Sequence, residues 1–288
     1  MRFSIIIPTY NREILLKRAL LSVIAQEYSN WECIVVDDGG NDGSADMVAG
    51  LEDERIKYYW KENGERGAAR NYGVSKASGE VVFYLDSDDI IFPNHLLLAN
   101  LFFEANPDAV FYHSRYQEWH PDKKVNSPIL DPVKINDFIK DQNQFACQFF
   151  LKKDVAAQIG FSENRSLKIG EDWLVILKIG ARYKLHISNE YTSAIIHHGE
   201  RSMEMATAAE ILQSKKLIIE ELEADDKVDK ATIEKVDIEL TSLSALAASI
   251  NGNKKISAKL LKSVVLQNGS FLFKKRTFAT LKKIVFGR

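Results

Sequence analysis

Short apolar runs alternate with segments of helical period along the first hundred residues. The runs are rich in β-branched and aromatic residues and are predicted to form buried strands at 3–7, 31–36, 55–59 and 80–85. The segments between them repeat apolar residues at helical spacing and are predicted to form helices over 13–27, 44–51 and 67–78. Near-continuous apolar strands that alternate with helices predict an α/β fold with a mostly parallel sheet.

The pattern after residue 93 is less regular. It predicts, in order, a helix over 94–105, a strand over 109–112, ordered structure over 145–160, a helix over 174–181 and a strand near 184–196. The polar stretch 113–144 is expected to be irregular, with one short helix near 134–140.

The character of the chain changes near residue 205. The remaining segments are rich in Lys, Glu, Ala and Leu and are predicted to form helices over 206–223, 229–250 and 254–267. We therefore expect two domains, an α/β domain over 1–204 and a helical region over 205–288. The tail 271–288 mixes six basic residues with aromatic and aliphatic ones, which suits either peripheral contact with an anionic membrane or a helix docked on the body.

Composition narrows the class of protein. The chain has 288 residues, 45% of them hydrophobic and 27% charged, with a net charge of -2. This balance argues against nucleic acid as a partner. Cys33 and Cys147 form no CxxC pair, which suggests a reducing compartment and no zinc site. The apolar run before Pro8 is too short for a signal peptide, so we expect a cytoplasmic protein, at most peripheral on the inner face of the membrane.

Polar clusters follow three of the predicted strands, at 9–12, 37–44 and 86–89. In parallel sheets ligands bind beyond the carboxyl ends of the strands, so these clusters are expected to converge on one site. Asp86, Asp88 and Asp89 concentrate negative charge that a cation would neutralise, and oxygen ligands suit Mg²⁺ or Mn²⁺. The alternative is a solvated acidic turn.

Five motifs in this order resemble the family 2 glycosyltransferases, inverting enzymes of the GT-A fold, over roughly residues 1–203. They are Ile7-Pro8-Thr9-Tyr10-Asn11-Arg12, Val36-Asp37-Asp38-Gly39 with Asp42-Gly43-Ser44, Gly67-Ala68-Ala69-Arg70-Asn71, Leu85-Asp86-Ser87-Asp88-Asp89 and Gly170-Glu171-Asp172-Trp173. The resemblance implies a GT-A (Rossmann-like) domain that binds a nucleotide-sugar. The region after 205 lies outside it.

The resemblance also implies roles for single residues. The nucleotide would be bound by Pro8, Thr9, Tyr10, Arg12, Asp38, Arg70 and Asp86. Asp38 would accept a hydrogen bond from a uracil N–H, and Arg70 would face the diphosphate or the base. Asp88, with Asp86 and His198, would hold the metal. The sequence does not decide whether His198 or the adjacent His197 is the histidine near the metal. Asp89 is expected to cap the helix after Pro93.

Asp172 would be the general base that deprotonates the acceptor hydroxyl, and Glu171 would orient the acceptor. Both acids also suit the N-terminal end of a helix, through its dipole. The chain departs from the family pattern in two places. Gly40 stands where a serine is common, and Ile195-Ile196 stands where Tyr-Arg often precedes the histidine, which puts one basic phosphate contact in doubt.

The resulting prediction is an inverting, metal-dependent hexosyltransferase in cell-surface polysaccharide or glycolipid synthesis. It would transfer a sugar from a nucleotide donor, expected to be UDP-linked, to a saccharide or lipid-linked hydroxyl acceptor. One alternative is a sugar-nucleotide nucleotidyltransferase, which would want a glycine-rich loop that 8–12 lacks. The other is a non-catalytic scaffold of a polysaccharide assembly, which would be expected to lose Asp88 or Asp172.

Overall fold

The computed structural model describes residues 1–127, 135–140, 145–198 and 206–286. The chain forms two compact units. Unit 1 comprises Met1–Asn136, Gln144–Glu163 and Arg182–His198, and unit 2 comprises Asp137–Asn143, Asn164–Ala181 and Gly199–Arg288. Each unit consists of several segments of the chain, and residues 164–181 belong to unit 2. The domain boundary expected near residue 205 stays a prediction.

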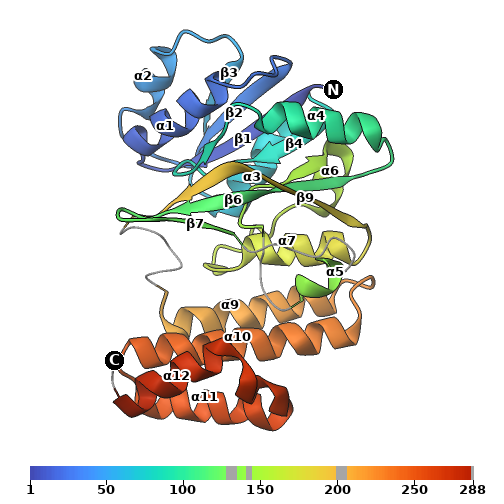
Figure 1. The fold of residues 1–288 in the computed structure, drawn as a ribbon. Helices are drawn as coiled ribbons and strands as arrows, with labels where there is room; N and C mark the ends of the chain where they lie inside the picture. The colour runs from blue at the N-terminus through green and yellow to red at the C-terminus, as the bar shows by residue number, and fades with distance from the viewer. Residues whose placement is uncertain (128–134, 141–144, 199–205, 287–288) are drawn as a thin grey trace. The chain divides into compact units, whose positions relative to one another are not determined.

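Unit 1 contains a mixed, mostly parallel sheet with helices on both faces (Figure 1), which confirms the predicted fold class. Its strands are β1 (Phe3–Thr9), β2 (Trp31–Asp37), β3 (Ile56–Trp60), β4 (Val81–Tyr84), β5 (Ile90–Ile91), β6 (Phe111–Trp119), β7 (Lys124–Asn126), β8 (Phe150–Lys152) and β9 (Leu185–Ile196). The strand order is β3-β2-β1-β4-β8-β6-β9-β5, and β7 pairs with β6. The strands β3, β2, β1 and β4 are parallel, as are β6 and β9, whereas β8 is antiparallel to β4 and β6.

The unit 1 helices follow from the apolar faces of the strands. They are α1 (Glu13–Ile24), α2 (Ser44–Ala49), α3 (Glu65–Lys76), α4 (His95–Ala105) and α6 (Lys153–Ile159). Ile5, Val35 and Phe83 belong to one buried cluster with side chains of α1, α2 and α4. Ile6 and Val36 point the other way, against Gly73 of α3. Alternate residues of one strand therefore bury both faces of the sheet.

The end of β1 differs from its prediction. The strand continues through Pro8 to Thr9 instead of ending at Ile7. Its pairing with β4 stops at Ile6, whereas its pairing with β2 reaches Thr9 opposite Asp37. Proline has no N–H to donate, and it is tolerated here because one side of the strand no longer needs a partner.

The prediction of an irregular region over 113–144 was wrong in its first part. Residues 113–119 continue β6, and β7 pairs with it antiparallel. The polar residues at the start of this segment suggested an exposed loop, but in the strand they are buried and hydrogen-bonded. Nδ1 of His113 lies 2.8 Å from the carbonyl oxygen of Gln148, and Oγ of Ser114 contacts Oγ1 of Thr192 at 2.5 Å. The short helix is α5 (Ile135–Phe138), and 128–134 and 141–144 lie outside the described residues.

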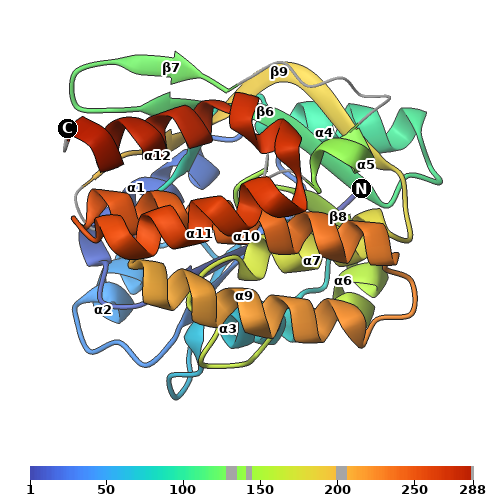
Figure 2. The same cartoon turned by 90° about the horizontal axis from the view of Figure 1, so that it is seen from below.

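Unit 2 is helical. It contains α7 (Glu171–Gly180), α9 (Ala208–Glu223), α10 (Lys230–Ile250), α11 (Lys254–Gln267), the short 3₁₀ helix η1 (Gly269–Phe273) and α12 (Lys275–Phe286). The helix α10 packs against α9, α11 and α12 (Figure 2). Side-chain caps fix the starts of α9, α10 and α11, through Thr207, Asp229 and Asn253. Among the described residues, no helix combines the length and apolarity needed to span a membrane.

Candidate active site

Three carboxylates gather directly after β4. Asp86, Asp88 and Asp89 each offer an oxygen, and these oxygens lie within 4.8 Å of one another. We call these residues the aspartate cluster. Asp88 and Asp89 are buried and Asp86 is half-buried. The strand end thus places three acids together, as predicted, and such a group is costly unless cations or hydrogen-bond donors surround it.

Asp88 is the most heavily contacted member of the cluster. Nη1 of Arg12 donates to Oδ2 of Asp88 at 3.0 Å, and Nε2 of His198 lies 2.9 Å from the same oxygen. Nη2 of Arg18, in α1, donates to the backbone carbonyl of Asp88 at 2.6 Å. The loops after β1, β4 and β9 therefore meet at this carboxylate. His198, the second of the two adjacent histidines, is thus in contact with Asp88.

Asp86 pairs with Arg70 of α3. Nη2 of Arg70 donates to Oδ1 of Asp86 at 2.7 Å, and the guanidinium lies 5.0 Å from the ring centroid of Phe161. Arg70 is only 1% exposed, so it is a buried cation and not one on the helix surface. A buried guanidinium needs a carboxylate partner, and this pair fixes both the arginine and one edge of the cluster.

Asp89 is held by neutral donors. Nε2 of Gln148 donates to its Oδ2 at 2.8 Å, and the backbone N–H of Ile196 donates to its Oδ1 at 3.1 Å. The expectation that Asp89 caps the helix after Pro93 was wrong, because α4 begins at His95 with Asn94 at the N-cap position. Asp89, which directly precedes β5, instead connects Gln148 to the end of β9, a structural role.

A second acidic site lies after β2. Oδ1 of Asp38 accepts hydrogen bonds from Nζ of Lys61 at 2.8 Å and from the backbone N–H of Gly64 at 2.9 Å. Asp38 is buried, and Lys61 is a partner that the sequence motif did not reveal. The predicted contact between Asp38 and a nucleobase stays a prediction.

Gly40 has a local structural reason. Its backbone N–H donates to Oδ1 of Asp37 at 2.7 Å. A Cβ at this position would lie 2.6 Å from that oxygen and 3.0 Å from Oδ1 of Asn11. A serine, common here in the resembling family, would therefore require the turn to shift.

The end of β1 and the loop after it hold the other predicted nucleotide contacts. Pro8 and Thr9 are buried, whereas the side chain of Tyr10 is 52% exposed. The hydroxyl of Thr9 is buried and has no hydrogen-bond partner among the described residues. An exposed ring and a buried unpaired hydroxyl at a strand end suit a ligand.

The predicted base belongs to unit 2. Glu171 and Asp172 occupy the first turn of α7, after Gly170, which takes a left-handed φ of 83° that favours glycine. Glu171 is buried and Asp172 is half-buried, and Oδ1 of Asp172 accepts a hydrogen bond from the N–H of Trp173 at 2.8 Å. Both acids do start a helix, as the alternative held, and this is compatible with catalysis.

The donor set of the aspartate cluster fits a hard divalent cation. It offers carboxylate oxygens from Asp86 and Asp88 on one strand end, and both aspartates already face positive or donor groups. Carboxylate oxygen is the ligand that Mg²⁺ and Mn²⁺ prefer. Asp89 is less available, because both of its oxygens accept hydrogen bonds from the protein.

Sequence reasoning missed several residues of this site. Arg18, Lys61 and Gln148 each contact an aspartate, yet they lie 70, 23 and 59 residues from it in the chain. Arg18 lies outside the buried face of α1, so the apolar pattern does not mark it. Only the fold reveals these three contacts.

Comparison with known proteins decides the family. A model described as glycosyl transferase family 2 matches residues 4–161, more than half of the chain. The chain belongs to glycosyl transferase family 2. The four motifs of residues 7–89 fall inside the match, whereas Glu171 and Asp172 fall outside it.

Two family members have informative names. The minor teichoic acid biosynthesis protein GgaB of Bacillus subtilis is 32% identical over 223 residues, which cover 72% of this chain and 24% of GgaB. The GalNAc(5)-diNAcBac-PP-undecaprenol beta-1,3-glucosyltransferase of Campylobacter jejuni is 40% identical over 92 residues, 31% of this chain and 30% of that protein. The chain likewise spans 26%, 30% and 19% of the length of three Rickettsia glycosyltransferases.

Two solved structures share the fold. TarS 1–349 of S. aureus, in complex with UDP-GlcNAc, superposes with a TM-score of 0.71 at 20% identity and covers 99% of this chain and 88% of its own. The mannosyltransferase PcManGT of Pyrobaculum calidifontis, in complex with GDP-Man and Mn²⁺, gives 0.58 at 14% identity, over 100% and 88% of the two chains. The GT-A-like fold with a C-terminal helical region is thus confirmed.

Proposed function

We propose that this glycosyltransferase is an inverting, metal-dependent enzyme that transfers a hexose from a UDP-linked donor to a hydroxyl acceptor. The observation that carries the proposal is the convergence of Arg12 and His198 on Asp88 within the aspartate cluster. The presence of UDP-GlcNAc in the structure of TarS supports the choice of donor. In the donor complex, Tyr10 and Asp38 contact the nucleobase, with Pro8 and Thr9 shaping the loop beneath it.

Asp86 and Asp88 would hold Mn²⁺ or Mg²⁺, with His198 beside them. The Mn²⁺ bound with GDP-Man in PcManGT supports this assignment. Such an ion supplies Lewis-acid stabilisation of the departing diphosphate. Arg12 and His198 contact the same carboxylate of Asp88.

Asp172 is the proposed general base, and Glu171 the acceptor-orienting acid. The motif and the half-buried carboxylate of Asp172 support this choice. A carboxylate that takes the acceptor proton as the new bond forms allows direct displacement at the anomeric carbon, which inverts its configuration.

The acceptor is proposed to be a saccharide or a lipid-linked saccharide in cell-surface polysaccharide or glycolipid synthesis. The names of GgaB and of the undecaprenol-dependent Campylobacter relative support this class. A peripheral membrane contact through α12 would suit a lipid-linked acceptor. The exposed side chains of α12 include Phe278, Leu281, Val285, Lys275 and Lys282, while Thr277 and Thr280 are buried.

A donor screen tests the proposal. The protein is incubated with UDP-, GDP- and dTDP-sugars and Mn²⁺, and the released nucleoside diphosphate is measured. Release from a UDP-sugar, lost on chelation of the metal, is the expected result. Release of pyrophosphate from a sugar phosphate and UTP would indicate the nucleotidyltransferase alternative. Binding of nucleotide-sugar without turnover, even with a panel of saccharide and lipid-linked acceptors, would indicate a scaffold.

A further inference from the structure

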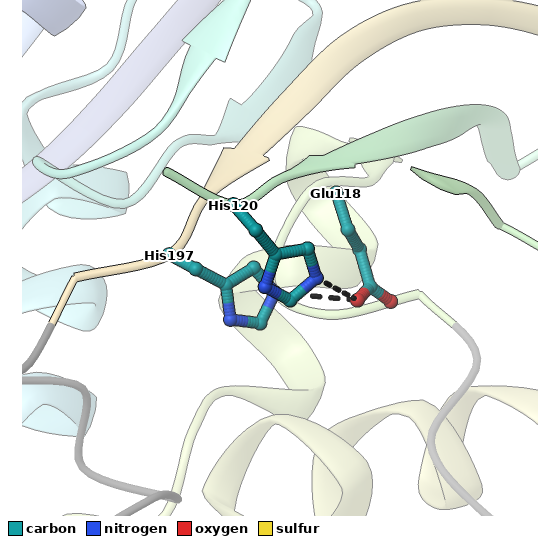
Figure 3. A group of neighbouring side chains, drawn as sticks. All are labelled: Glu118, His120 and His197. Carbon is teal, nitrogen blue, oxygen red and sulfur yellow. Dashed lines mark hydrogen bonds and ion pairs between the residues drawn. The ribbon is translucent and has the colours of Figure 1, made fainter. Parts of the chain in front are cut away.

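A second group of candidate ligands lies where β6 and β9 end. Glu118 is in β6, His120 follows β6 and His197 follows β9 (Figure 3). Nε2 of His197 lies 3.2 Å, and Nε2 of His120 3.6 Å, from the same oxygen, Oε2 of Glu118. Ligand atoms of the three residues lie within 4.8 Å of one another. We call these residues the Glu-His-His cluster.

The sheet fixes the backbone of this cluster. The strands β6 and β9 are parallel, with Glu118 opposite Ile195. The N–H of His197 donates to the carbonyl oxygen of Trp119 at 2.8 Å, and the N–H of His120 donates to that of Lys123 at 2.8 Å. The three side chains therefore converge from paired strands, which gives the precise placement that a metal site requires.

The side chains are ordered but accessible. The two imidazole rings stack with centroids 3.8 Å apart and planes 18° apart, and Figure 3 shows a nitrogen of each directed at Glu118. The side chains of Glu118, His120 and His197 remain 35%, 26% and 21% exposed. An ion can thus reach them from solvent, and water can complete its coordination.

The donor atoms select the kind of ion. Two imidazole nitrogens and one carboxylate oxygen are the ligands of Zn²⁺ sites that keep a position for water, whereas Mg²⁺ prefers oxygen alone. The aspartate cluster differs in this respect, because it offers three carboxylates with one histidine, His198, beside them. The expectation of no zinc site rested on the spacing of Cys33 and Cys147, and it did not consider histidine and glutamate ligands.

We propose that Glu118, His120 and His197 bind a Zn²⁺ ion, separately from the cation of the aspartate cluster. Binding requires the nearly parallel rings to tilt so that both Nε2 lone pairs meet at one ion, while the strand backbone stays in place. The adjacent residues His197 and His198 then serve different ions, since His198 contacts Asp88.

Calorimetric titration of the full chain with ZnCl₂, in the presence of excess Mg²⁺, tests the proposal. One site with a dissociation constant on the order of micromolar is expected, and Glu118→Gln and His120→Asn should each weaken it at least about tenfold. His186→Asn, a histidine of β9 outside the cluster, and Asp88→Asn should leave it unchanged. Circular dichroism checks that the variants are folded, and Co²⁺ absorption reports nitrogen ligation.

Three results would overturn the site. They are the absence of Zn²⁺ binding to the wild type, equal binding by the Glu118 and His120 variants, and loss of binding in Asp88→Asn alone, which would assign the ion to the aspartate cluster. The first would identify the stacked pair and its carboxylate as a structural contact.

Discussion

Units 1 and 2 use charged side chains differently. In unit 1, charged groups converge on one edge of the sheet, where the aspartate cluster meets Arg12, Arg70 and His198. In unit 2, charged groups join neighbouring helices: Lys178 of α7 pairs with Glu221 of α9 at 2.7 Å, and Arg276 of α12 pairs with Glu239 of α10 at 2.9 Å. A charge network that joins loops prepares a ligand site, whereas pairs that join helices hold a scaffold together.

All six histidines also belong to unit 1, at positions 95, 113, 120, 186, 197 and 198. We therefore expect donor and metal chemistry, and sensitivity to mild acid, to be properties of unit 1. Unit 2 would contribute one catalytic acid and a surface. Each expectation can be tested by a change confined to one unit.

The largest effect is expected at Asp172, because it is a proposed catalytic residue that belongs to unit 2 and not to unit 1. A positioned carboxylate base contributes about 10²–10⁴-fold, or roughly 3–5 kcal/mol of barrier. Asp172→Asn keeps the shape and removes the basicity, so single-turnover transfer should fall at least about 100-fold while donor affinity hardly changes. Glu171→Gln is the matched control and should act mainly on acceptor KM. Normal transfer by both variants would place the base elsewhere.

The next effect sharpens the role of unit 1. Asp88→Ala should weaken Mn²⁺-dependent binding of UDP by at least about 100-fold, because it removes the carboxylate at which the loops meet. Titration of UDP with and without Mn²⁺ measures this. Asp154→Ala, an exposed acid of α6, is the control and should behave as wild type. If Asp88→Ala retained its response to Mn²⁺, the metal assignment would be wrong.

The buried histidines allow a test of whether unit 1 is more sensitive to acid than unit 2. Burial lowers the pKa of His95 to about 3 and that of His113 to about 4, both below the ordinary value of 6.5. As the pH falls, the unfolded chain therefore binds protons at these two histidines that the folded chain does not bind. The contribution of the two histidines to the stability of the folded state is complete above pH 6.5 and is lost as the pH falls towards 4. Between pH 7 and 5, each of these two histidines should lower the free energy of unfolding of unit 1 by roughly 1–2 kcal/mol.

Hydrogen exchange followed by mass spectrometry, corrected for intrinsic rates, measures this separately in peptides of each unit. Peptides from β1, β4 and α4 should lose protection between pH 7 and 5, and those from α10 and α11 should not. Equal loss in both sets would show that the units unfold together or that other groups dominate.

Much of the fold could be predicted because apolar period is a local property. The helices α10 and α11 and the strands β2 and β4 were all predicted within one residue of their bounds. Residues 113–119 of β6 were missed because polar residues at its start have partners far along the chain. His113, for example, contacts the carbonyl oxygen of Gln148.

In the candidate site, too, local features could be predicted and contacts between distant parts of the chain could not. Acids that directly follow an apolar strand, such as Asp86 and Asp88, are visible in the sequence. Their partners Arg12, Arg70 and His198 were also predicted as site residues. Arg18 was not predicted, because it reaches the carbonyl of Asp88 only through the fold. Asp89 shows the limit most clearly: the sequence predicted a helix cap, whereas its carboxylate accepts hydrogen bonds from Gln148 and Ile196, which lie 59 and 107 residues away in the chain.

The smallest effect concerns α12 and the surface of unit 2. Lys274 and Arg276 contact Glu239, so not all six basic residues of the tail are available to a membrane. Lys275 and Lys282 are exposed beside Phe278, which is 58% exposed, and Leu281. Each basic residue near an anionic surface contributes about 1 kcal/mol. Lys275→Gln with Lys282→Gln should therefore weaken binding to vesicles of anionic lipid about thirtyfold.

The control for this test is Lys254→Gln with Lys255→Gln, which removes two exposed lysines from the start of α11 and should leave vesicle binding unchanged. These paired substitutions are preferable to truncation at residue 270. Truncation would remove the buried Phe271 and the partners of Glu239, and it would disturb α10 as well as the surface. Co-sedimentation at two salt concentrations separates the electrostatic part, since added salt should narrow the difference between wild type and the α12 variant. If both double variants bind vesicles as the wild type does, the exposed lysines of α12 do not contribute to membrane binding, and the proposed electrostatic contact is wrong.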